Sequence, residues 1–462
     1  MATPVNPLDP EFRIAKLLDD GNYELLIPRT DCGMVAATGQ VKGNKVVVFA
    51  SDPTIKGGAL GIEGSQVIIQ AYRAAMGAQA PVIGIWHSGG ARLSDGVASL
   101  NAFGEVFQAM VTASGRIPQL SLVLGPTAGG GAYGPALTDV VVLAPEGRIF
   151  VTGPDVVKSV TGDIVDMALL GGPEAHSKNS GLAHVIAPTE EVAYSEIQDL
   201  VSLFANQGLM AANVEDVPLA HLVPDSSKRI YEVHPLVDAI LDKDGEKLEL
   251  LDMWAENMTT VIGRLGGRTV GVIANNPQVI GGVLDAAASE KAARFVRTCD
   301  AFGIPLVVIA DVTGFLPGIG QEWEGAVRRG AKQLHAFAEA VVPRVTVITR
   351  KAYGGAFVAM NSKSLGATRV FAWPQAEVSV MGAIAAVRVL HRRLLADLPE
   401  DQRADMELEL AAEHEKVSGG VARAIEIGAV DEMIEPDKTR SAIAKVLAET
   451  EYRRGSHGNI PL

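Results

Sequence analysis

The strongest constraint on the fold of this chain is an internal repeat of glycine and proline positions. The segment TGQVKGNKVVVFASDP, followed by KGGALG, aligns with IGRLGGRTVGVIANNP, followed by IGGVLD, and the register continues with one single-residue insertion. The repeated pairs are Gly39 with Gly263, Gly43 with Gly267, Pro53 with Pro277, Gly57-Gly58 with Gly281-Gly282, Pro81 with Pro305, Gly90 with Gly314, Pro118 with Pro343 and Gly129-Gly130 with Gly354-Gly355. Because chance would rarely align so many glycines and prolines, the repeat predicts two halves with the same fold.

Each half contains an apolar run that ends in a glycine cluster. The first copy is QLSLVLGPTAGGGAYG and the second is RVTVITRKAYGGAF. A strand, a tight turn and small residues suited to a helix start would present free N–H groups at the positive end of a helix dipole, which is an anion site built without side chains. One such cluster is more typical of a plain turn, but two in one framework favour an anion site. The candidate residues are Gly129, Gly130 and Gly131 in the first half and Gly354, Gly355 and Ala356 in the second.

Helical and strand patterns alternate in both halves. The first half predicts a helix over residues 65–76 and a strand over 81–86, and their counterparts in the second half are residues 289–302 and 305–310. Such alternation is typical of an α/β fold with largely parallel sheets.

The boundary between the halves is expected in the stretch LVPDSSKRIYEVHP, which carries turn residues and mixed polarity after a helical segment at residues 190–206. The predicted domains are therefore residues 1–225 and 226–462. Residues 397–416, rich in Glu, Asp, Leu and Ala, predict an exposed helix whose charges form a solvated face.

Composition limits the function classes. A chain of 462 residues suits two domains, and 48% apolar with 20% charged residues is a globular composition. The balance of 40 Lys and Arg against 54 Asp and Glu gives a net charge of −14, which argues against a nucleic-acid partner. Any anionic ligand must therefore be held by local groups.

Cysteine content and hydropathy exclude further classes. Cys32 and Cys299 lie far apart and have no CxxC or nearby histidine pattern, so neither a disulfide framework nor a cysteine zinc site is expected, and we expect no metal. The N-terminal stretch is polar, and no run of 18 uncharged apolar residues occurs. We therefore expect a soluble, cytoplasmic protein without a membrane partner.

The first residue of the motif SGGAR and the residue before it are candidate catalytic groups. Ser88 does not lie in a GxSxG elbow, because Trp86 stands where the first glycine should be, and this argues against a serine hydrolase. His87 has no acidic residue nearby in the sequence to orient it, which favours a packed or surface histidine. No side chain in these motifs is an obvious general base.

Several stretches together resemble the biotin-dependent acyl-CoA carboxyltransferases, specifically the β subunits of acetyl- and propionyl-CoA carboxylases. The resemblance runs from Gly39 through the rest of the sequence. It implies two tandem crotonase-like (ClpP/crotonase) domains, each a spiral of ββα units, in agreement with the repeat. The stretches are SGGAR (88–92), VTGPDVVKSVTG (151–162), ASEKAARFVRTCDAFGIP (288–305), TRKAYGGA (349–356), AWPQAEVSVMG (372–382) and HGNIPL (457–462).

The resemblance implies transfer of a carboxyl group from N1-carboxybiotin, carried on a separate subunit, to the α-carbon of an acyl-CoA. Negative charge then develops on an enolate oxygen and on the ureido oxygen, and preorganised donors stabilise such charge. The family assigns the first glycine turn and residues 1–225 to acyl-CoA, and the second turn and residues 226–462 to biotin. In the usual account the biotin anion removes the α-proton, so no catalytic His or Glu is required.

Coenzyme A contacts are expected from two further turns, GGALG at 57–61 and SGGAR. Both turns can equally be structural, with solvated charges beside them. The candidate residues are Lys56, Gly57, Gly58 and Ala59 at the first turn, and Ser88, Gly89, Gly90, Ala91 and Arg92 at the second.

Acyl-chain choice is expected to depend on Val358. Propionyl-CoA-type members continue the second glycine motif as GGAYD, whereas this chain has Phe357 and Val358 after Ala356. Because the aspartate position is associated with acyl-chain selection in the family, the change favours acetyl-CoA or relaxed use of short chains. Alternatively, Val358 only repacks the pocket, and one methylene is worth merely ~1–3 kcal/mol.

The sequence shows no AMKM-like biotinyl-lysine context, no Walker loop and no cysteine zinc ribbon. We therefore expect a separate biotin carboxylase and biotin carboxyl carrier partner. Family members place the first domain of one subunit against the second domain of another, which implies a homo-oligomer that is at least a dimer and commonly a hexamer. Two alternatives stay open: a biotin-dependent acyl-CoA decarboxylase or transcarboxylase subunit, and a non-catalytic scaffold subunit.

Overall fold

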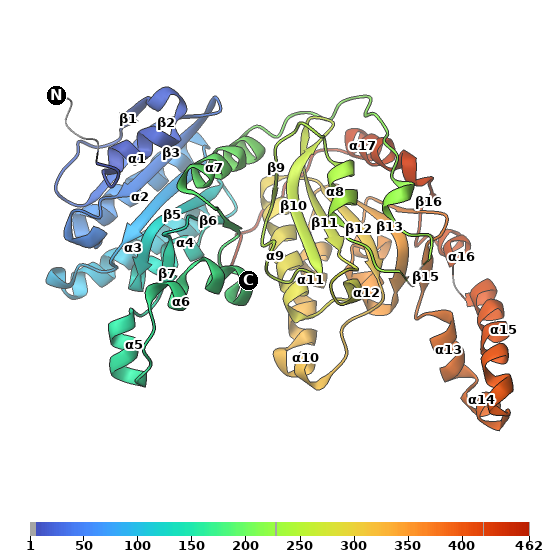
Figure 1. Ribbon diagram of the computed structural model, residues 1–462. Coiled ribbons are helices and arrows are strands. Elements are labelled where there is room, and N and C mark those ends of the chain that lie inside the picture. The colour runs from blue at the N-terminus through green and yellow to red at the C-terminus, as the bar shows by residue number, and fades with distance from the viewer. Residues whose placement is uncertain (1–5, 227–228, 419, 462) are drawn as a thin grey trace. The chain divides into compact units, whose positions relative to one another are not determined.

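The computed structural model describes residues 6–226, 229–418 and 420–461, which form two compact units (Figure 1). Unit 1 contains the described residues up to Gln207, together with Leu248–Trp254 and the segment from Ser456 onward. Unit 2 contains Gly208–Lys247 and Ala255–Gly455.

The chain enters unit 2 at Gly208, earlier than the predicted boundary after residue 225. The physical reason is that the connecting stretch is already anchored in the second core. Leu219 is fully buried there, and the N–H of Ala211 donates a hydrogen bond of 2.8 Å to the carbonyl of Gly266. Turn composition near residue 224 therefore marks a bend within unit 2.

Unit 1 is built on one sheet in the order β1-β2-β3-β4-β5-β6-β8, with β7 also paired to β5. The first three strands are antiparallel, and the pairs from β3 onward are parallel. The strands are β1 (Tyr23–Leu25), β2 (Met34–Val41), β3 (Asn44–Ser51), β4 (Val82–Ser88), β5 (Gln119–Ala128), β6 (Val140–Leu143), β7 (Arg148–Phe150) and β8 (Val185–Ile186). The helices are α1 (Pro10–Leu17), α2 (Ile62–Ala78), α3 (Val97–Ala113), α4 (Tyr133–Ala136), α5 (Pro154–Thr161), α6 (Met167–Gly171) and α7 (Glu190–Ala205).

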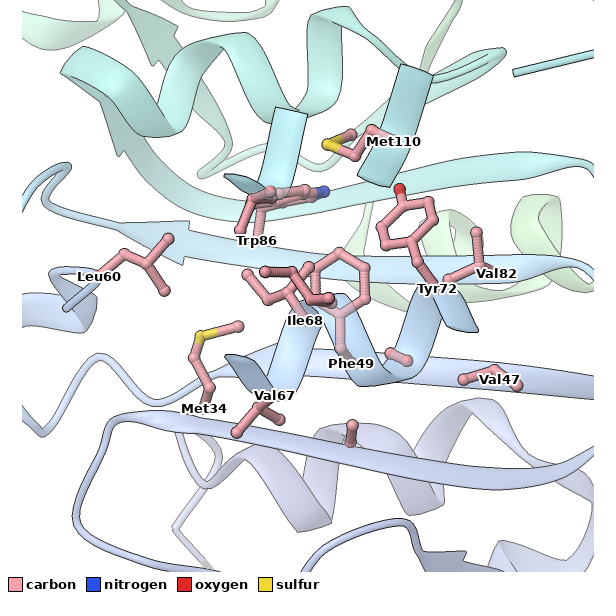
Figure 2. Packing of buried hydrophobic residues seen from close by; sticks show 14 of the residues in the cluster. Met34, Val47, Phe49, Leu60, Val67, Ile68, Tyr72, Val82, Trp86 and Met110 are labelled. Atoms are coloured by element: carbon pink, nitrogen blue, oxygen red, sulfur yellow. The ribbon is translucent and has the colours of Figure 1, made fainter. Parts of the chain in front are cut away.

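The core of unit 1 lies between this sheet and helices α2 and α3. Figure 2 shows Phe49, Ile68 and Trp86 packed together there. The rings of Phe49 and Trp86 meet edge to face with centroids 5.2 Å apart, an arrangement that aromatic quadrupoles favour. This packing fixes the directions of β3 and β4, whose carboxyl ends carry two of the glycine turns.

Unit 2 repeats the plan with a sheet in the order β16-β14-β13-β12-β11-β10-β9, and β15 also pairs β13. Its strands are β10 (Met258–Leu265), β11 (Arg268–Asn275), β12 (Leu306–Val312), β13 (Arg344–Tyr353), β14 (Arg369–Ala372), β15 (Glu377–Ser379) and β16 (Glu432–Met433), and the order also includes the short strand β9 (Lys247–Glu249), of which Lys247 belongs to unit 2. Its helices are α8 (His234–Ile240), α9 (Ala286–Phe302), α10 (Ile319–Glu324), α11 (Ala326–Glu339), α12 (Gly354–Ala359), α13 (Ala383–Leu390), α14 (Arg392–Asp397), α15 (Glu400–Ser418), α16 (Gly420–Glu426) and α17 (Thr439–Glu449).

The backbone confirms the repeat read from the sequence. The isolated bridge Leu60↔Ala91 in unit 1 has its counterpart in Leu284↔Phe315 in unit 2. The predicted helices over 65–76 and 289–302 lie within α2 and α9, and the exposed helix predicted over 397–416 corresponds to α15. Helix α9 starts where Asp285 accepts a hydrogen bond of 2.7 Å from the N–H of Ala288, and it ends at Gly303 with φ +71°.

None of the helices in the described part of the chain is long and apolar enough to span a bilayer.

Residues 457–461 pack into unit 1. The N–H of Asn459 donates to Ser114 Oγ at 2.9 Å, and its Nδ2 donates to Asp139 Oδ1 at 2.6 Å. Gly115 has φ +69°, and a Cβ there would lie 2.0 Å from the carbonyl oxygen of His457. The turn after α3 thus admits the segment only because residue 115 has no side chain.

We predict that Gly115→Ala will displace this segment and destabilise unit 1 by about 1–3 kcal/mol. The cause is the clash with the His457 carbonyl together with the left-handed backbone. Thermal unfolding and limited proteolysis would measure the effect. Gly104→Ala is the matched control, because a Cβ at this α3 position meets nothing within 4 Å. Equal stability of the two variants would contradict the packing described.

Candidate functional site

Three glycine-bearing loops of unit 1 meet at one edge of its sheet. Strands β3, β4 and β5 are parallel neighbours, so the loops that follow them emerge side by side. The N–H of Gly89 donates to the carbonyl of Gly57 at 2.8 Å, and the N–H of Leu60 donates to the carbonyl of Gly90 at 2.8 Å. The motifs GGALG and SGGAR, which are separated in sequence, therefore form one surface with the glycine turn after β5.

The loops approach each other so closely that two positions exclude any side chain. A Cβ at Gly58 would lie 2.1 Å from the carbonyl oxygen of His87, and a Cβ at Gly90 would lie 2.9 Å from that of Ala128. Both glycines also have positive φ, +72° and +92°. Glycine is therefore required here for backbone contact, whatever ligand binds.

The turn after β5 runs over Gly129–Ala132 as a 3₁₀ turn and continues into α4. Gly129 adopts φ +57°, and Gly131 is buried. The first N–H groups of such a turn have no partner within it, so they can bind an anion or a developing oxyanion.

Unit 2 repeats this turn at the end of β13. Gly354 has φ +58°, matching Gly129, and leads into α12. Ala356 is fully buried, whereas Gly355 is exposed, and the nearest heavy atom to a Cβ placed there would be Phe315 Cε2 at 3.9 Å. The backbone at Gly355 therefore borders open space.

The expected helix dipole is weaker than the sequence suggested. Helix α4 has four residues and α12 has six, and so short a helix contributes little macrodipole. The helix start expected after each turn is present, but each helix ends within two turns. Any charge stabilisation at these turns must come from individual N–H groups.

The predicted coenzyme A residues divide into exposed and buried groups. Lys56, Gly57 and Gly89 are exposed, Ala59, Ala91, Arg92 and Val358 are half-buried, and Gly58, Ser88 and Gly90 are buried. The guanidinium of Arg92 donates to the carbonyl of Cys32 at 2.8 Å, which ties that side chain to the scaffold. Contact of these residues with a ligand stays a prediction.

Sequence reasoning missed a buried ion pair beneath the second glycine turn. Arg350 Nε donates to Asp311 Oδ2 at 2.8 Å, and both side chains are only 3% exposed. Arg350 also donates to the carbonyls of Ser226 and Arg229 and stacks on Tyr231, 4.7 Å from the ring centroid. The repeat carries a signal for this pair. Asp311 and Arg350 align with His87 and Gly125 of unit 1, so an acid and a base appear together only in the second half.

His87 packs within unit 1 instead of forming an acid–base pair. Its ring covers Gly125, where a Cβ would lie 2.4 Å from His87 Nδ1. Burial, and then the positive charge of Arg13, lowers the pKa of His87 to about 4. The imidazole is therefore neutral at pH 7. These contacts support the interpretation of a packed histidine.

Among the described residues, no group of three or more His, Cys, Asp or Glu side chains is arranged to hold a metal ion.

We predict that His87 makes unit 1 acid-sensitive. Its pKa in the folded chain lies below the ordinary value of 6.5, so between pH 6.5 and 4 the unfolded state binds more protons. Stability should therefore fall as pH falls through this window. His87→Gln should flatten the dependence when thermal unfolding midpoints are compared from pH 7 to pH 4.5. Parallel pH profiles for both proteins would show that the packed, neutral state of His87 is wrongly assigned.

Comparison with known proteins came from sequence and from structure. The family model described as the carboxyl transferase domain matches residues 15–456. The chain is 57% identical over 461 residues to the biotin-dependent acetyl-/propionyl-coenzyme A carboxylase beta6 subunit of Mycobacterium tuberculosis, covering 99% of this chain and 98% of that protein. It is 52% identical over 463 residues to the propionyl-CoA carboxylase beta chain of Rhodococcus erythropolis, covering 99% and 97%.

A solved structure agrees with the sequence matches. Transcarboxylase 12S, described as a hexamer with methylmalonyl-coenzyme A and methylmalonic acid bound, superposes with a TM-score of 0.91 at 37% identity. The match covers 98% of this chain and 92% of that one. The expected α/β fold of two tandem crotonase-like units is thereby confirmed.

Proposed function

Because this chain belongs to the carboxyl transferase family, as a biotin-dependent β subunit of the acetyl-/propionyl-CoA carboxylase type, we propose that it carboxylates short acyl-CoAs at the α-carbon. The carboxyl donor is N1-carboxybiotin held on a separate biotin carboxylase and carrier subunit. Acetyl-CoA gives malonyl-CoA for fatty-acid and related lipid synthesis, and propionyl-CoA gives methylmalonyl-CoA.

The observation that carries this proposal is the pair of equivalent glycine turns. Gly129 and Gly354 adopt the same left-handed backbone at the ends of the equivalent strands β5 and β13. Loss of an α-proton from an acyl-CoA leaves an enolate oxygen, which backbone N–H groups at Gly129, Gly130 and Gly131 would stabilise. Loss of one such donor costs roughly 3 kcal/mol of transition-state stabilisation.

The second turn, Gly354, Gly355 and Ala356, would hold the ureido oxygen of biotin. The fit rests on the open space in front of Gly355 and on the N–H groups at the start of α12. When bound, carboxybiotin supplies the carboxyl group. The contribution of this chain is to orient that oxygen and to keep bulk away from it.

We propose that the working protein is a homo-oligomer that contains at least two copies of this chain. Transcarboxylase 12S, which shares its fold, is described as a hexamer. Each unit exposes large apolar side chains four residues apart on one helix, in α5 and in α10, and such an exposed apolar face is typical of an interface. Helix α5 extends away from the rest of unit 1 (Figure 1). The exposed residues are Val156, Val160, Ile164 and Leu169 in unit 1 and Ile319, Trp323 and Val327 in unit 2.

Two alternatives use the same surfaces. A decarboxylase or transcarboxylase subunit would run the same enolate chemistry in another direction, and the likeness to transcarboxylase 12S keeps this alternative open. A non-catalytic scaffold subunit would need no intact glycine turns, so their presence in both units supports an enzyme. ATP-dependent carboxylation with a biotin carboxylase partner separates the first alternative from our proposal.

The function is tested by the reverse half-reaction. The purified chain is incubated with free biotin and either malonyl-CoA or methylmalonyl-CoA, and release of the decarboxylated acyl-CoA is measured. We expect biotin-dependent turnover that Gly355→Val lowers about 100-fold or more, because bulk would fill the space in front of α12. Gly77→Val is the control, since a Cβ at this exposed α2 position meets nothing within 4 Å. No turnover by the folded, oligomeric wild type would favour the scaffold alternative.

We predict that Val358→Asp lowers use of acetyl-CoA relative to propionyl-CoA. Val358 is half-buried on α12, four residues after the glycine that starts the turn, so a carboxylate there would change the polarity beside the second site. The ratio of kcat/KM for the two substrates should shift by about tenfold. Val358→Thr, which keeps the shape without the charge, should leave the ratio close to wild type. An unchanged ratio in the aspartate variant would refute the role in chain selection.

A further inference from the structure

The side chain of Ser88 joins the three loops of the first site. Its hydroxyl donates to the carbonyl of Gly58 at 2.8 Å and accepts from the N–H of Gly90 at 3.2 Å. Ser88 is only 5% exposed. A Cβ at Gly131 would lie 3.3 Å from Ser88 Oγ, so the turn after β5 rests against the same atom.

We propose that Ser88 is a positioning residue that holds the backbone donors of the first site in place, without itself contacting the acyl-CoA. This inference rests on the proposed function. It replaces the expectation that Ser88 contacts coenzyme A, because a buried hydroxyl that is already donating and accepting has no proton left for a ligand.

The loops need such an anchor because they are rich in glycine. Gly58 and Gly90 have positive φ, and glycine backbone samples more conformations than any other residue. A peptide unit is planar and trans, so fixing the carbonyl of Gly58 also fixes the direction of the N–H of Ala59, which donates to the carbonyl of Lys56 at 3.2 Å and so holds the loop together. The Ser88 hydroxyl thus sets the orientation of a peptide in one loop and an N–H in the next.

Unit 2 supplies an internal comparison. The residue at the place of Ser88 is Val312, which has no hydroxyl. The equivalent carbonyl, that of Gly282, accepts from Asn275 Nδ2 at 3.2 Å instead. Asn275 is fully buried, and its Oδ1 accepts from the N–H of Asp311 at 3.3 Å.

The residue at the place of Asn275 in unit 1 is Ser51, which accepts from the equivalent N–H but reaches a different carbonyl. Its hydroxyl accepts from the N–H of His87 at 2.8 Å and lies 2.9 Å from the His87 carbonyl. The two units therefore fix the same carbonyl with side chains from different strands, β4 in unit 1 and β11 in unit 2. Both units keep a side-chain hydrogen bond to this carbonyl although the donor residue differs. We infer that the site requires the carbonyl to be fixed.

The consequence for catalysis follows from geometry. Oxyanion donors are effective because they are already placed where charge develops, and a misplacement of about 1 Å can cost ~10²-fold in rate. Release of the Gly58 carbonyl would let the loops at 57–60 and 89–92 shift against the turn at Gly129–Ala132. The affinity for the parts of the substrate that lie far from the reacting atoms would change less than kcat.

The test compares Ser88→Val with Ser88→Thr, which have the same shape and differ only in the hydroxyl. In the reverse half-reaction with malonyl-CoA and free biotin, Ser88→Val should lower kcat by about 10- to 100-fold with the KM for free biotin unchanged. Ser88→Thr should restore most of the turnover. Asn275→Leu is the reciprocal variant, and it should alter the KM for free biotin more than the KM for malonyl-CoA.

Amide hydrogen exchange measures whether Ser88 holds the loops in place, independently of turnover. Ser88→Val should exchange faster than Ser88→Thr at residues 57–60 and 89–92, while residues 281–284 exchange alike in both. Equal kcat and equal exchange in the two variants would overturn the inference. Failure of the wild type to turn over any substrate would count against the proposed function alone, since the exchange comparison would still decide the role of Ser88.

Discussion

The contact on which the rest of the first site depends is the approach of backbone to backbone at the carboxyl edge of the unit 1 sheet. In unit 1 the carbonyl of His87 leaves no room for a side chain at Gly58, and the carbonyl of Ala128 leaves none at Gly90. The core beneath, with Phe49 against Trp86, sets the strand directions that make these approaches possible. Small, exposed N–H surfaces thus rest on a rigid apolar base.

The two units share a backbone but differ in the electrostatics below it. Unit 2 places the buried pair Asp311 and Arg350 under its turn, and a buried pair is strongly destabilised when one partner is removed. Unit 1 places neutral His87 over Gly125 at the same positions. The glycine turn of unit 1 is therefore built on an uncharged support, and that of unit 2 on a charge-compensated one that also holds the connecting stretch at Ser226 and Arg229.

Sequence periodicity and repeat alignment predicted the strands, the helices and the pairing of glycine turns, because these depend on local pattern. The contacts divide at Gly208 and not after residue 225, since anchoring of Leu219 in the second core is a tertiary contact that turn composition does not report. The roles of Ser88 and Asn275 were equally hidden. They depend on which carbonyl a hydroxyl or amide reaches, and that distance exists only once parallel strands bring distant loops together.

The placement of the segment from Ser456 onward has a consequence for synthesis. Unit 1 contains residues that the ribosome adds only after Gly208–Gly455, so the first unit must emerge with the site at Ser114, Gly115 and Asp139 vacant. Domains generally form as they are translated, at about 5–20 residues per second, which leaves this site open for roughly 12 to 50 seconds. During that interval the vacant site at Ser114, Gly115 and Asp139 is a surface that a chaperone can bind.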